Sequence, residues 1–455
     1  MLMTSLGKDE KFCGMMEMGK GHSYQGSRLG QKDFNQDFDH FLDRRLIFGG
    51  VGDHSVLRKM LPFLEGEQWK AVRSAISHTF TTSKIRRYND HFNSIGKSWT
   101  EMLRNKAENS KERGSATVQV ISAVNQFAVD VISATVFGMD GGAIKNPNAV
   151  FATNAIKLAK FKQAQVILGM YFPRLCKFLG LEPLDGKSLA FFENLVTEGL
   201  KARMSGATAK RNDFLQMMVE LKKGELKDDE KEELDSFEKE AQISSDAKKK
   251  KQFLTDDVIN SQSFMFFFAG FSAPKDFCTF TLYVLAVYQD IQEKVREEVN
   301  RFMKDDGTLA YDDVGKLVYL DMVFCEVLRK YPPGFRQERV CTKDYNDPET
   351  GLFVPKGTLV PFPCILFTMT SNTLITLISL IRSILLQKTK PKDIIIHSCP
   401  GGMRLALIEC KSFICHIVHR FRIEPTEKTQ IPIKTVRAPL QQMPPPDLEL
   451  KFTVL

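Results

Sequence analysis

The chain has 455 residues, of which 43% are hydrophobic and 26% are charged. This composition excludes collagen, a wholly disordered chain and a small disulfide-stabilised domain, and the length allows a large buried core. The nine cysteines are scattered without a C-x-x-C pair, which favours free thiols in a reducing compartment. The net charge of +8 is spread along the chain, so we expect no nucleic-acid partner.

The first 31 residues form an atypical amino-terminal segment. Lysine and arginine are interspersed among Met and Gly, and no apolar run is long enough for a signal peptide or a membrane-spanning helix. We therefore expect residues 1–31 to carry no membrane anchor and residues 32–455 to form one domain.

The next part of the chain has the pattern of helices. From Lys32 to about Tyr171 the pattern is helical with short interruptions, and the segment from Glu67 to Phe80 places Trp69, Val72 and Ile76 on one helical face.

Residues 222–252 differ sharply in composition, because charged residues and Ser replace most apolar ones, and we expect an exposed loop. Thr255 then offers an N-cap for a long apolar helix that includes Ser263 to about Tyr288. Lys275 and Asp276 near its middle would each cost about 2.5–3.5 kcal/mol in a membrane. A buried central helix is therefore favoured over a membrane span.

Further along, the chain predicts another helix and a small sheet. The segment from Tyr311 to Tyr331 is helical in pattern, and the segment from Phe353 to Val360 predicts a strand and a turn that contains Pro355 and Gly357. The predicted fold class is mainly α with minor β.

Glu326 and Arg329 are the first pair that suggests a specific role. They are three residues apart and share a helical face, although a surface ion pair of this kind contributes under about 1 kcal/mol. Their context is more informative, because C-E-V-L-R-K-Y-P-P is followed by F-R-Q-E-R-V and V-P-K-G-T.

Three earlier stretches agree with this context. They are L-E-G-E-Q-W-K-A-V-R from Leu64, F-T-T-S-K-I-R-R from Phe80, and K-R-N-D-F-L-Q-M-M-V-E from Lys210. In this order and spacing the chain resembles the cytochrome P450 family of haem-thiolate monooxygenases, in particular the microsomal branch of the vertebrate 3A enzymes. The resemblance covers about residues 32–363 and resumes at residue 402, and it implies an amino-terminally truncated P450 fold.

The resemblance implies residues that bind haem b, iron protoporphyrin IX. Trp69 and Arg73, four apart on one helical face, would present an indole N–H and a guanidinium to a propionate. Arg339 matches a further propionate contact. Arg44 is a looser match, for which an exposed arginine is the alternative.

Two further residues receive a structural role from the resemblance. Glu326 and Arg329 would form a buried ion pair that holds their helix against the segment on the proximal side of the haem. Loss of one partner would leave a buried charge without compensation.

The oxygen-binding face departs from the family pattern. The family's A-G-x-acid-Thr is here Ala269, Gly270, Phe271, Ser272 and Ala273, so the usual carboxylate and hydroxyl for proton delivery are absent. We expect Ala269, Gly270, Ser272 and Ala273 to line the oxygen face. Ser272 is the nearest hydroxyl, with a plain packing role as its alternative.

The iron ligand is the more serious departure. Counting from G-M-R-L-A-L-I-E-C-K, the family's cysteine falls on Pro400, and Cys399 is one residue out of place without the usual Phe, Gly and Arg around it. The metal ligand is therefore unknown, and Cys399 is the nearest candidate. We interpret residues 364–401 as a frame-shifted or mis-spliced form of the meander and cysteine loop.

A zinc site and an α-helical membrane protein are the alternatives to this interpretation. His416 and His419 are three apart on a helix, yet no third ligand at zinc-site spacing is nearby. An α-helical membrane protein would need the long apolar helix and the run from Ile365 to Ile381, which is rich in Ser and Thr.

The expected function is oxidation of small apolar substrates with O2 and electrons from NADPH through NADPH-cytochrome P450 reductase. Residues 151–184 resemble the roof of the substrate cavity, which contacts the membrane surface, and the family suggests the endoplasmic reticulum membrane. The alternative is a non-catalytic, truncated or mis-spliced member that lacks the axial thiolate.

Overall fold

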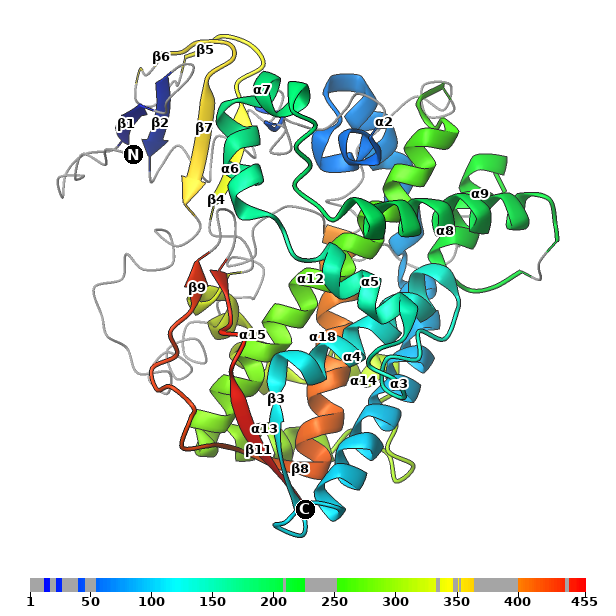
Figure 1. Ribbon diagram of the computed structural model, residues 1–455, viewed down its shortest axis with the longest axis vertical. Coiled ribbons are helices and arrows are strands. Elements are labelled where there is room, and N and C mark those ends of the chain that lie inside the picture. Colours follow the sequence, from blue (N-terminus) through cyan, green and yellow to red (C-terminus); the bar gives the residue numbers. More distant parts are fainter. Residues whose placement is uncertain are drawn as a thin grey trace.

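The protein is described from a computed structural model and has a largely helical body with small sheets at its periphery (Figure 1). This confirms the predicted mainly α fold with minor β. The structure describes residues 12–16, 22–26, 40–45, 55–207, 210–225, 252–332, 336–346, 351, 353–363, 400–437 and 442–455. Most of the predicted charged loop and residues 364–399 lie outside these ranges.

The described helices fall into a few long ones, which build the core, and several short ones around them. The α-helices are α2 (Gly66–Ser77), α3 (Thr82–Glu108), α4 (Val120–Ile132), α5 (Val150–Leu158), α6 (Gln163–Tyr171), α7 (Pro173–Phe178), α8 (Gly186–Met204), α9 (Phe214–Lys223), α12 (Asp256–Val287), α13 (Gln289–Asn300), α14 (Tyr311–Val314), α15 (Val318–Lys330) and α18 (Pro400–Arg420). Short 3-10 turns are η2 (Val56–Lys59), η3 (Leu61–Phe63) and η4 (His78–Phe80), and η5 (Ser133–Phe137) is a π-helical turn.

The strands form four small sheets, with the orders β1-β2-β7-β4, β3-β11-β8, β10-β9 and β5-β6. Their bounds are β1 (Phe12–Met16), β2 (His22–Gly26), β3 (Ser115–Gln119), β4 (Arg336–Val340), β5 (Tyr345–Asn346), β6 (Phe353–Val354), β7 (Leu359–Pro363), β8 (Phe421–Pro425), β9 (Val436–Arg437), β10 (Gln442–Met443) and β11 (Glu449–Val454). β11 is antiparallel to both neighbours, with Phe452 opposite Ala116 and Ile423.

Two strands lie where the sequence analysis predicted no element. β1 and β2 pair antiparallel, and Ser23 of β2 lies parallel to Leu359 of β7. Their sequences, F-C-G-M-M and H-S-Y-Q-G, contain none of the β-branched residues that usually indicate strands. The sheet register comes from the partner strands, so only the tertiary structure reveals it.

The long central helix follows the sequence prediction closely. Thr255 caps α12, with its Oγ1 3.4 Å from the N–H of Val258, and the helix continues through Pro274. Its second half is almost wholly buried, as expected for a core helix. Among the described residues, the apolar segment Val120–Phe137 is long enough to cross a membrane, and most of it is also packed inside the protein.

The predicted helix from Tyr311 to Tyr331 is interrupted. The chain leaves the helical conformation at Gly315, which is the C-cap of α14, and becomes helical again at Val318. The predicted strand and turn from Phe353 is confirmed as β6, a turn and β7, with Gly357 at φ +84°.

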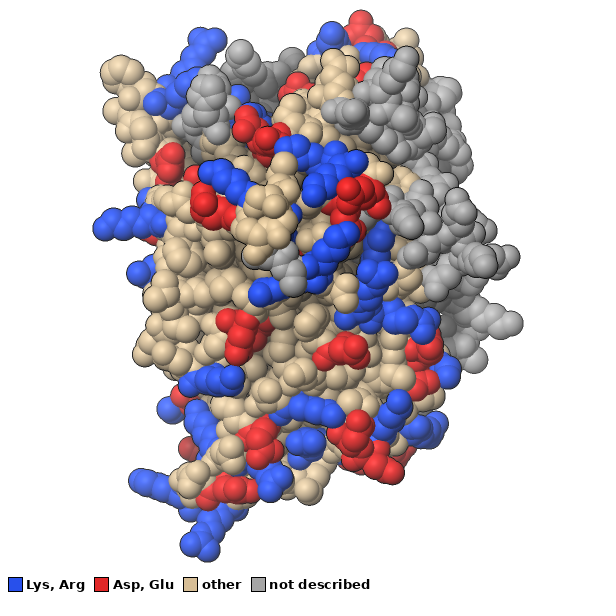
Figure 2. Space-filling view, turned by 90° about the vertical axis from the view of Figure 1, so that its right-hand side faces the viewer, with Lys and Arg blue, Asp and Glu red and all other residues tan. Residues whose placement is uncertain are grey.

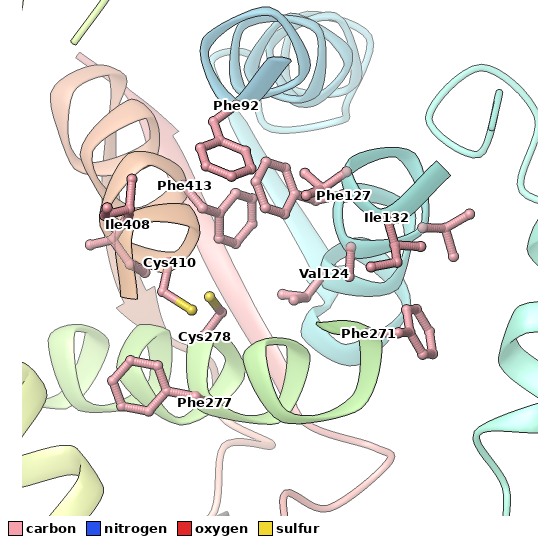
Figure 3. Packing of buried hydrophobic residues seen from close by; sticks show 14 of the residues in the cluster. Phe92, Val124, Phe127, Ile132, Phe271, Phe277, Cys278, Ile408, Cys410 and Phe413 are labelled. Carbon is pink, nitrogen blue, oxygen red and sulfur yellow. The ribbon is translucent and has the colours of Figure 1, made fainter. Parts of the chain in front are cut away.

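α18 lies at the centre of the molecule, between α3, α12 and α13 (Figure 1). Phe413 stacks on Phe127 at 4.1 Å between ring centroids and meets Trp99 edge-on at 5.0 Å. Figure 3 shows Phe413 and Phe127 between the two helices that carry them. The Trp99 Nε1 donates a hydrogen bond to the carbonyl of Ala123 at 2.8 Å, which satisfies its one polar atom inside the core.

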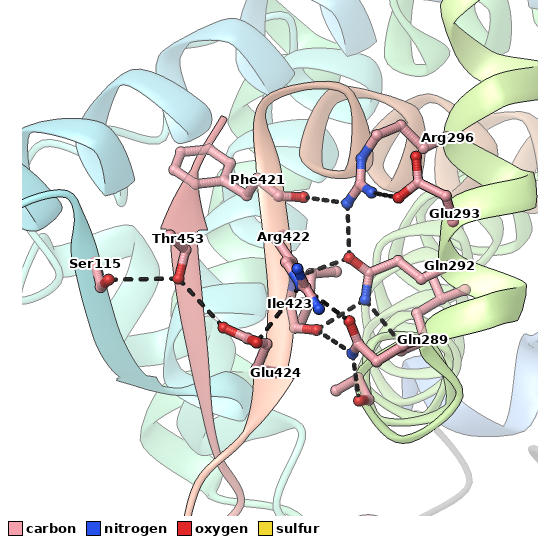
Figure 4. Close-up of polar contacts among 12 residues, drawn as sticks. Ser115, Gln289, Gln292, Glu293, Arg296, Phe421, Arg422, Ile423, Glu424 and Thr453 are labelled. Atoms are coloured by element: carbon pink, nitrogen blue, oxygen red, sulfur yellow. Dashed lines mark hydrogen bonds and ion pairs between the residues drawn. The ribbon is translucent and has the colours of Figure 1, made fainter.

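A polar network fixes the end of α18 to α13 (Figure 4). The Gln292 side chain donates to the carbonyl of Ile423 at 2.7 Å and accepts from its N–H at 2.9 Å, as a neighbouring strand would. Arg296 donates to the carbonyls of Val418 and Phe421 at 2.9 and 3.1 Å. These bonds satisfy backbone groups where α18 ends and β8 begins.

Gly96 allows α3 and α18 to approach closely. A Cβ atom at Gly96 would overlap the imidazole ring of His416. That ring is buried, with Nε2 3.2 Å from Oδ1 of Asn93, and burial lowers the pKa of His416 to about 3, so the ring is neutral at pH 7.

We expect Gly96→Ala to destabilise the protein by about 1–3 kcal/mol, because overlap with the ring outweighs the better helix propensity of Ala. Urea unfolding followed by circular dichroism measures this change. Gly186→Ala is the control, because its Cβ would lie 3.7 Å from the flexible end of Glu182. Equal stability of the two variants would contradict close packing at Gly96.

Candidate functional site

A cavity of about 470 Å³ lies between α12 and α18, and α2, α3 and β4 contribute to its wall. Its volume falls in the range of small-molecule and cofactor sites. The wall is mainly apolar, with cationic side chains from α2, from β4 and from the segment before α2.

One face of α12 forms a wall of the cavity. Ala269, Gly270, Ala273, Pro274 and Phe277 line it, at the spacing that places residues on one side of a helix. Ala269 and Ala273 are exposed to the cavity, although the helix around them is packed inside the protein. Small side chains therefore leave room for a flat ligand against this helix.

Gly270 and Pro274 shape the middle of that wall. A Cβ atom at Gly270 would lie 2.7 Å from Cδ1 of Ile132, so a larger residue here would displace the end of the Ile132 side chain on α4. Pro274 has no N–H to donate to the carbonyl of Gly270, four residues earlier. The place where α12 lacks this backbone hydrogen bond thus lies on the cavity wall.

Ser272 is not among the residues that line this cavity, and its place on the oxygen face stays a prediction, with a plain packing role as its alternative. The cavity is lined by Ala269, Gly270 and Ala273, whereas Ser272 is absent from its lining. The physical reason is helical periodicity, because Ser272 is rotated by about 100° from Ala273. The described part of α12 therefore presents no hydroxyl to the cavity.

The opposite wall is the first half of α18. Gly402, Ala406 and Glu409 line the cavity at i, i+4 and i+7, and Met403 and Cys410 lie beside them. The sequence analysis missed Glu409 and Cys410 as site residues. The helical spacing from Gly402 was the signal that could have placed them on the cavity face.

The predicted propionate contacts come together at this cavity from distant parts of the chain. Trp69 and Arg73 lie on α2, Arg339 on β4, and Arg44 in the segment before α2, and all four line the cavity. Burial and the nearby positive charge of Arg44 lower the pKa of Arg339 to about 9. This accumulation of positive charge favours an anionic group at this place.

Aromatic side chains form much of the apolar wall. Phe80, Phe214 and Phe266 contact one another, with ring centroids 4.9 Å apart for Phe80 and Phe266 and 4.0 Å apart for Phe214 and Phe266. All three line the cavity together with Phe92 and Phe277. They exclude water and offer apolar surface to a ligand.

Glu326 and Arg329 form an ion pair on α15, as their spacing indicated. Arg329 Nε and Nη2 donate to the two carboxylate oxygens of Glu326, both at 2.6 Å. The Glu326 side chain is buried and that of Arg329 is partly buried. The segment that this pair was expected to hold lies outside the described residues, so its role remains a prediction.

The donor set fits the porphyrin part of a haem, because guanidinium and indole N–H groups line a mainly apolar cavity. The described residues do not provide a matching fit for the ligand of the haem iron. Cys399 lies outside the described residues, and Pro400, to which the sequence analysis assigned the family's cysteine position, begins α18. Among the described cysteines, Cys410 lines the cavity, but burial raises its pKa well above the usual value and keeps it a neutral thiol.

The chain thus has a helical fold that encloses a mainly apolar cavity lined by several cationic side chains. The cytochrome P450 family model matches residues 32–368, and the chain belongs to this family. It is 28% identical to cytochrome P450 3A9 of Rattus norvegicus, over 89% of this chain and 77% of the relative. It is 29% identical to cytochrome P450 3A7 of Homo sapiens, over 87% and 75%. Cytochrome P450 9e2 of Blattella germanica is 29% identical, over 88% and 78%.

These matches confirm the resemblance to the 3A branch and the assignment as a cytochrome P450 monooxygenase by family. The roles of the individual site residues are a separate question, which substitution can answer.

We expect Arg339→Gln to lower the haem content of the purified protein at least tenfold, because a buried cation opposite a propionate contributes more than about 1.4 kcal/mol. The absorbance ratio of haem to protein measures the change. Arg45→Gln is the matched control, because Arg45 binds Glu338 at 2.9 Å and does not line the cavity. Equal haem content in both variants would contradict a role of Arg339 in haem binding.

Proposed function

We propose that this chain binds haem b in the cavity between α12 and α18 and oxidises small apolar substrates with O2. A haem supplies the iron at which dioxygen is activated. The observation that carries the proposal is the convergence of Trp69, Arg73 and Arg339, from elements far apart in sequence, on one apolar cavity of a P450-family chain.

The residues of the chain would act by binding, orientation and exclusion of water. The guanidinium groups of Arg73, Arg339 and Arg44 would neutralise the propionates, and the indole of Trp69 would donate a hydrogen bond. Ala269, Gly270 and Ala273 would leave space on the oxygen face. They supply no proton, so proton delivery would depend on water or on the substrate rather than on α12 side chains.

The substrate preference follows from the cavity wall. Phe80, Phe214 and Phe266 contact one another and present apolar surface to the cavity. These three rings offer no charge that could pair with a polar substrate group. Burial of such surface contributes about 25 cal/mol per Å². Small apolar molecules are therefore the proposed substrate class.

Electrons would come from NADPH through NADPH-cytochrome P450 reductase, and this partner is inferred from the family. The face in Figure 2 carries acidic and basic side chains interspersed. On α3, Arg86 pairs with Asp312 and Arg104 with Glu108. Neither the mixed charge of this face nor these ion pairs of α3 give independent support for one docking position of the reductase.

The proposed location at the endoplasmic reticulum membrane has one supporting surface. The segment that contains α6 and α7 exposes large apolar side chains. They are Ile167, Leu168, Phe172, Leu175, Phe178 and Leu179. Phe178 is 86% exposed, and Arg174 and Lys177 beside it are exposed cations. Apolar residues with neighbouring cations suit the surface of an anionic bilayer.

We expect Phe172→Glu/Phe178→Glu to reduce binding to phosphatidylcholine–phosphatidylserine vesicles at least tenfold, because two apolar contacts are lost and two negative charges are added. Vesicle co-sedimentation measures the binding. Val318→Glu is the control, because Val318 is also exposed and apolar but lies at the start of α15. An equal loss in the control variant would contradict a specific membrane surface.

The second candidate is a non-catalytic, truncated or mis-spliced member without an axial thiolate. Its support is that the sequence analysis assigned the family's cysteine position to Pro400 and that the family match ends at residue 368. Residues 364–401 would then be a frame-shifted meander and cysteine loop, and the iron ligand of an authentic product would be missing here.

The reduced, carbon-monoxide-treated difference spectrum separates the two candidates. A Soret band at the thiolate-specific position is expected if the chain supplies a cysteine ligand, and Cys399→Ser should then abolish it. A haem complex with the band at the position of a neutral ligand, or no haem uptake, supports the non-catalytic candidate. A long-read transcript across codons 360–405 tests the frame shift independently.

A further inference from the structure

Cys278 of α12 and Cys410 of α18 form a pair of thiols between the two helices that enclose the cavity. Figure 3 shows their sulfur atoms directed towards each other across the helix contact. The Cys410 thiol donates a weak hydrogen bond to the carbonyl oxygen of Pro274 at 3.9 Å. Both residues are free cysteines with at most 2% of their surface exposed to solvent.

A small molecule can reach one of these two buried thiols through the cavity. Cys410 lines the cavity, whereas Cys278 lies behind it and is not part of the lining. A small oxidant in the cavity would therefore meet Cys410 first. The second thiol already lies next to the product of that reaction.

We propose that Cys278 and Cys410 are a redox site, which a hydroperoxide oxidises to a disulfide that links α12 to α18. The Cys410 sulfur attacks one oxygen of the peroxide and the O–O bond breaks. Cys410 becomes a sulfenic acid, and, when the oxidant is hydrogen peroxide, the other oxygen leaves as water. The Cys278 sulfur then attacks the sulfenic sulfur, the S–O bond breaks, and a second water leaves. Two thiols are oxidised by two electrons and one peroxide is reduced.

The environment sets the conditions of this reaction. Burial raises the pKa of Cys410, so little thiolate is present at pH 7 and the reaction is slow there. The rate should rise with pH as the thiolate fraction grows. The product closes a long loop between two core helices, which should increase thermal stability.

The consequence concerns the cavity. α12 and α18 carry opposite walls of it, and a covalent link between them would fix their separation. The proposed haem would occupy the same cavity, so this reaction is proposed for the haem-free chain, and its failure would leave the proposed function untouched.

The test treats the purified full-length chain with hydrogen peroxide at pH 7 and pH 9, blocks remaining thiols with iodoacetamide and maps peptides without reduction. The expected result is a cross-linked peptide pair that contains Cys278 and Cys410, forms at least several-fold faster at pH 9 and disappears on reduction with dithiothreitol. The oxidised protein should also melt several degrees higher.

Cys278→Ala and Cys410→Ala should each abolish the cross-link, and Cys415→Ala, a buried cysteine on the same helix, should leave it in place. Sulfinic acid at Cys410 with Cys278 still free to react with iodoacetamide would overturn the proposal. So would a cross-linked pair that joins other cysteines. The peptide map of the unsubstituted chain decides the question even if a variant fails to fold.

Discussion

The packing of α18 against α3 and α12 is the constraint on which the rest of the structure depends. Its second half is sealed in the core by Phe413, by the close approach at Gly96 and by the hydrogen bonds of Gln292 and Arg296. Its first half then has a fixed position opposite α12. The cavity exists because α18 is anchored at its second half, while α12 presents the small residues Ala269, Gly270 and Ala273 to the first half of α18.

The cavity combines two opposing demands. Its apolar walls favour a low-polarity ligand, yet Arg339 and Arg44 bring like charges together there and lower the pKa of Arg339. A buried cation is costly unless an anion compensates it. A flat apolar ligand with carboxylates at one edge satisfies both demands, and the family to which the chain belongs uses such a cofactor.

The same helices carry features that the family resemblance did not assign. Glu409 is buried on the cavity wall, and burial raises the pKa of its carboxyl well above the usual value. Cys410 beside it contacts Cys278 across the helix interface. Glu409 and Cys410 thus place a titratable and an oxidisable group on the α18 wall of the cavity. Ala269, Gly270 and Ala273 on the α12 wall provide neither.

The sequence by itself determined the fold class, the helices around Trp69 and Glu326, and the long helix from Thr255, because each depends on local periodicity and capping. It also brought Trp69, Arg73 and Arg339 together through family resemblance. Only the tertiary structure placed Glu409 and Cys410 on the cavity wall and paired β2 with both β1 and β7. The reason is that the rotation of a helix about its axis and the partner of a strand are set by contacts between residues far apart in the chain.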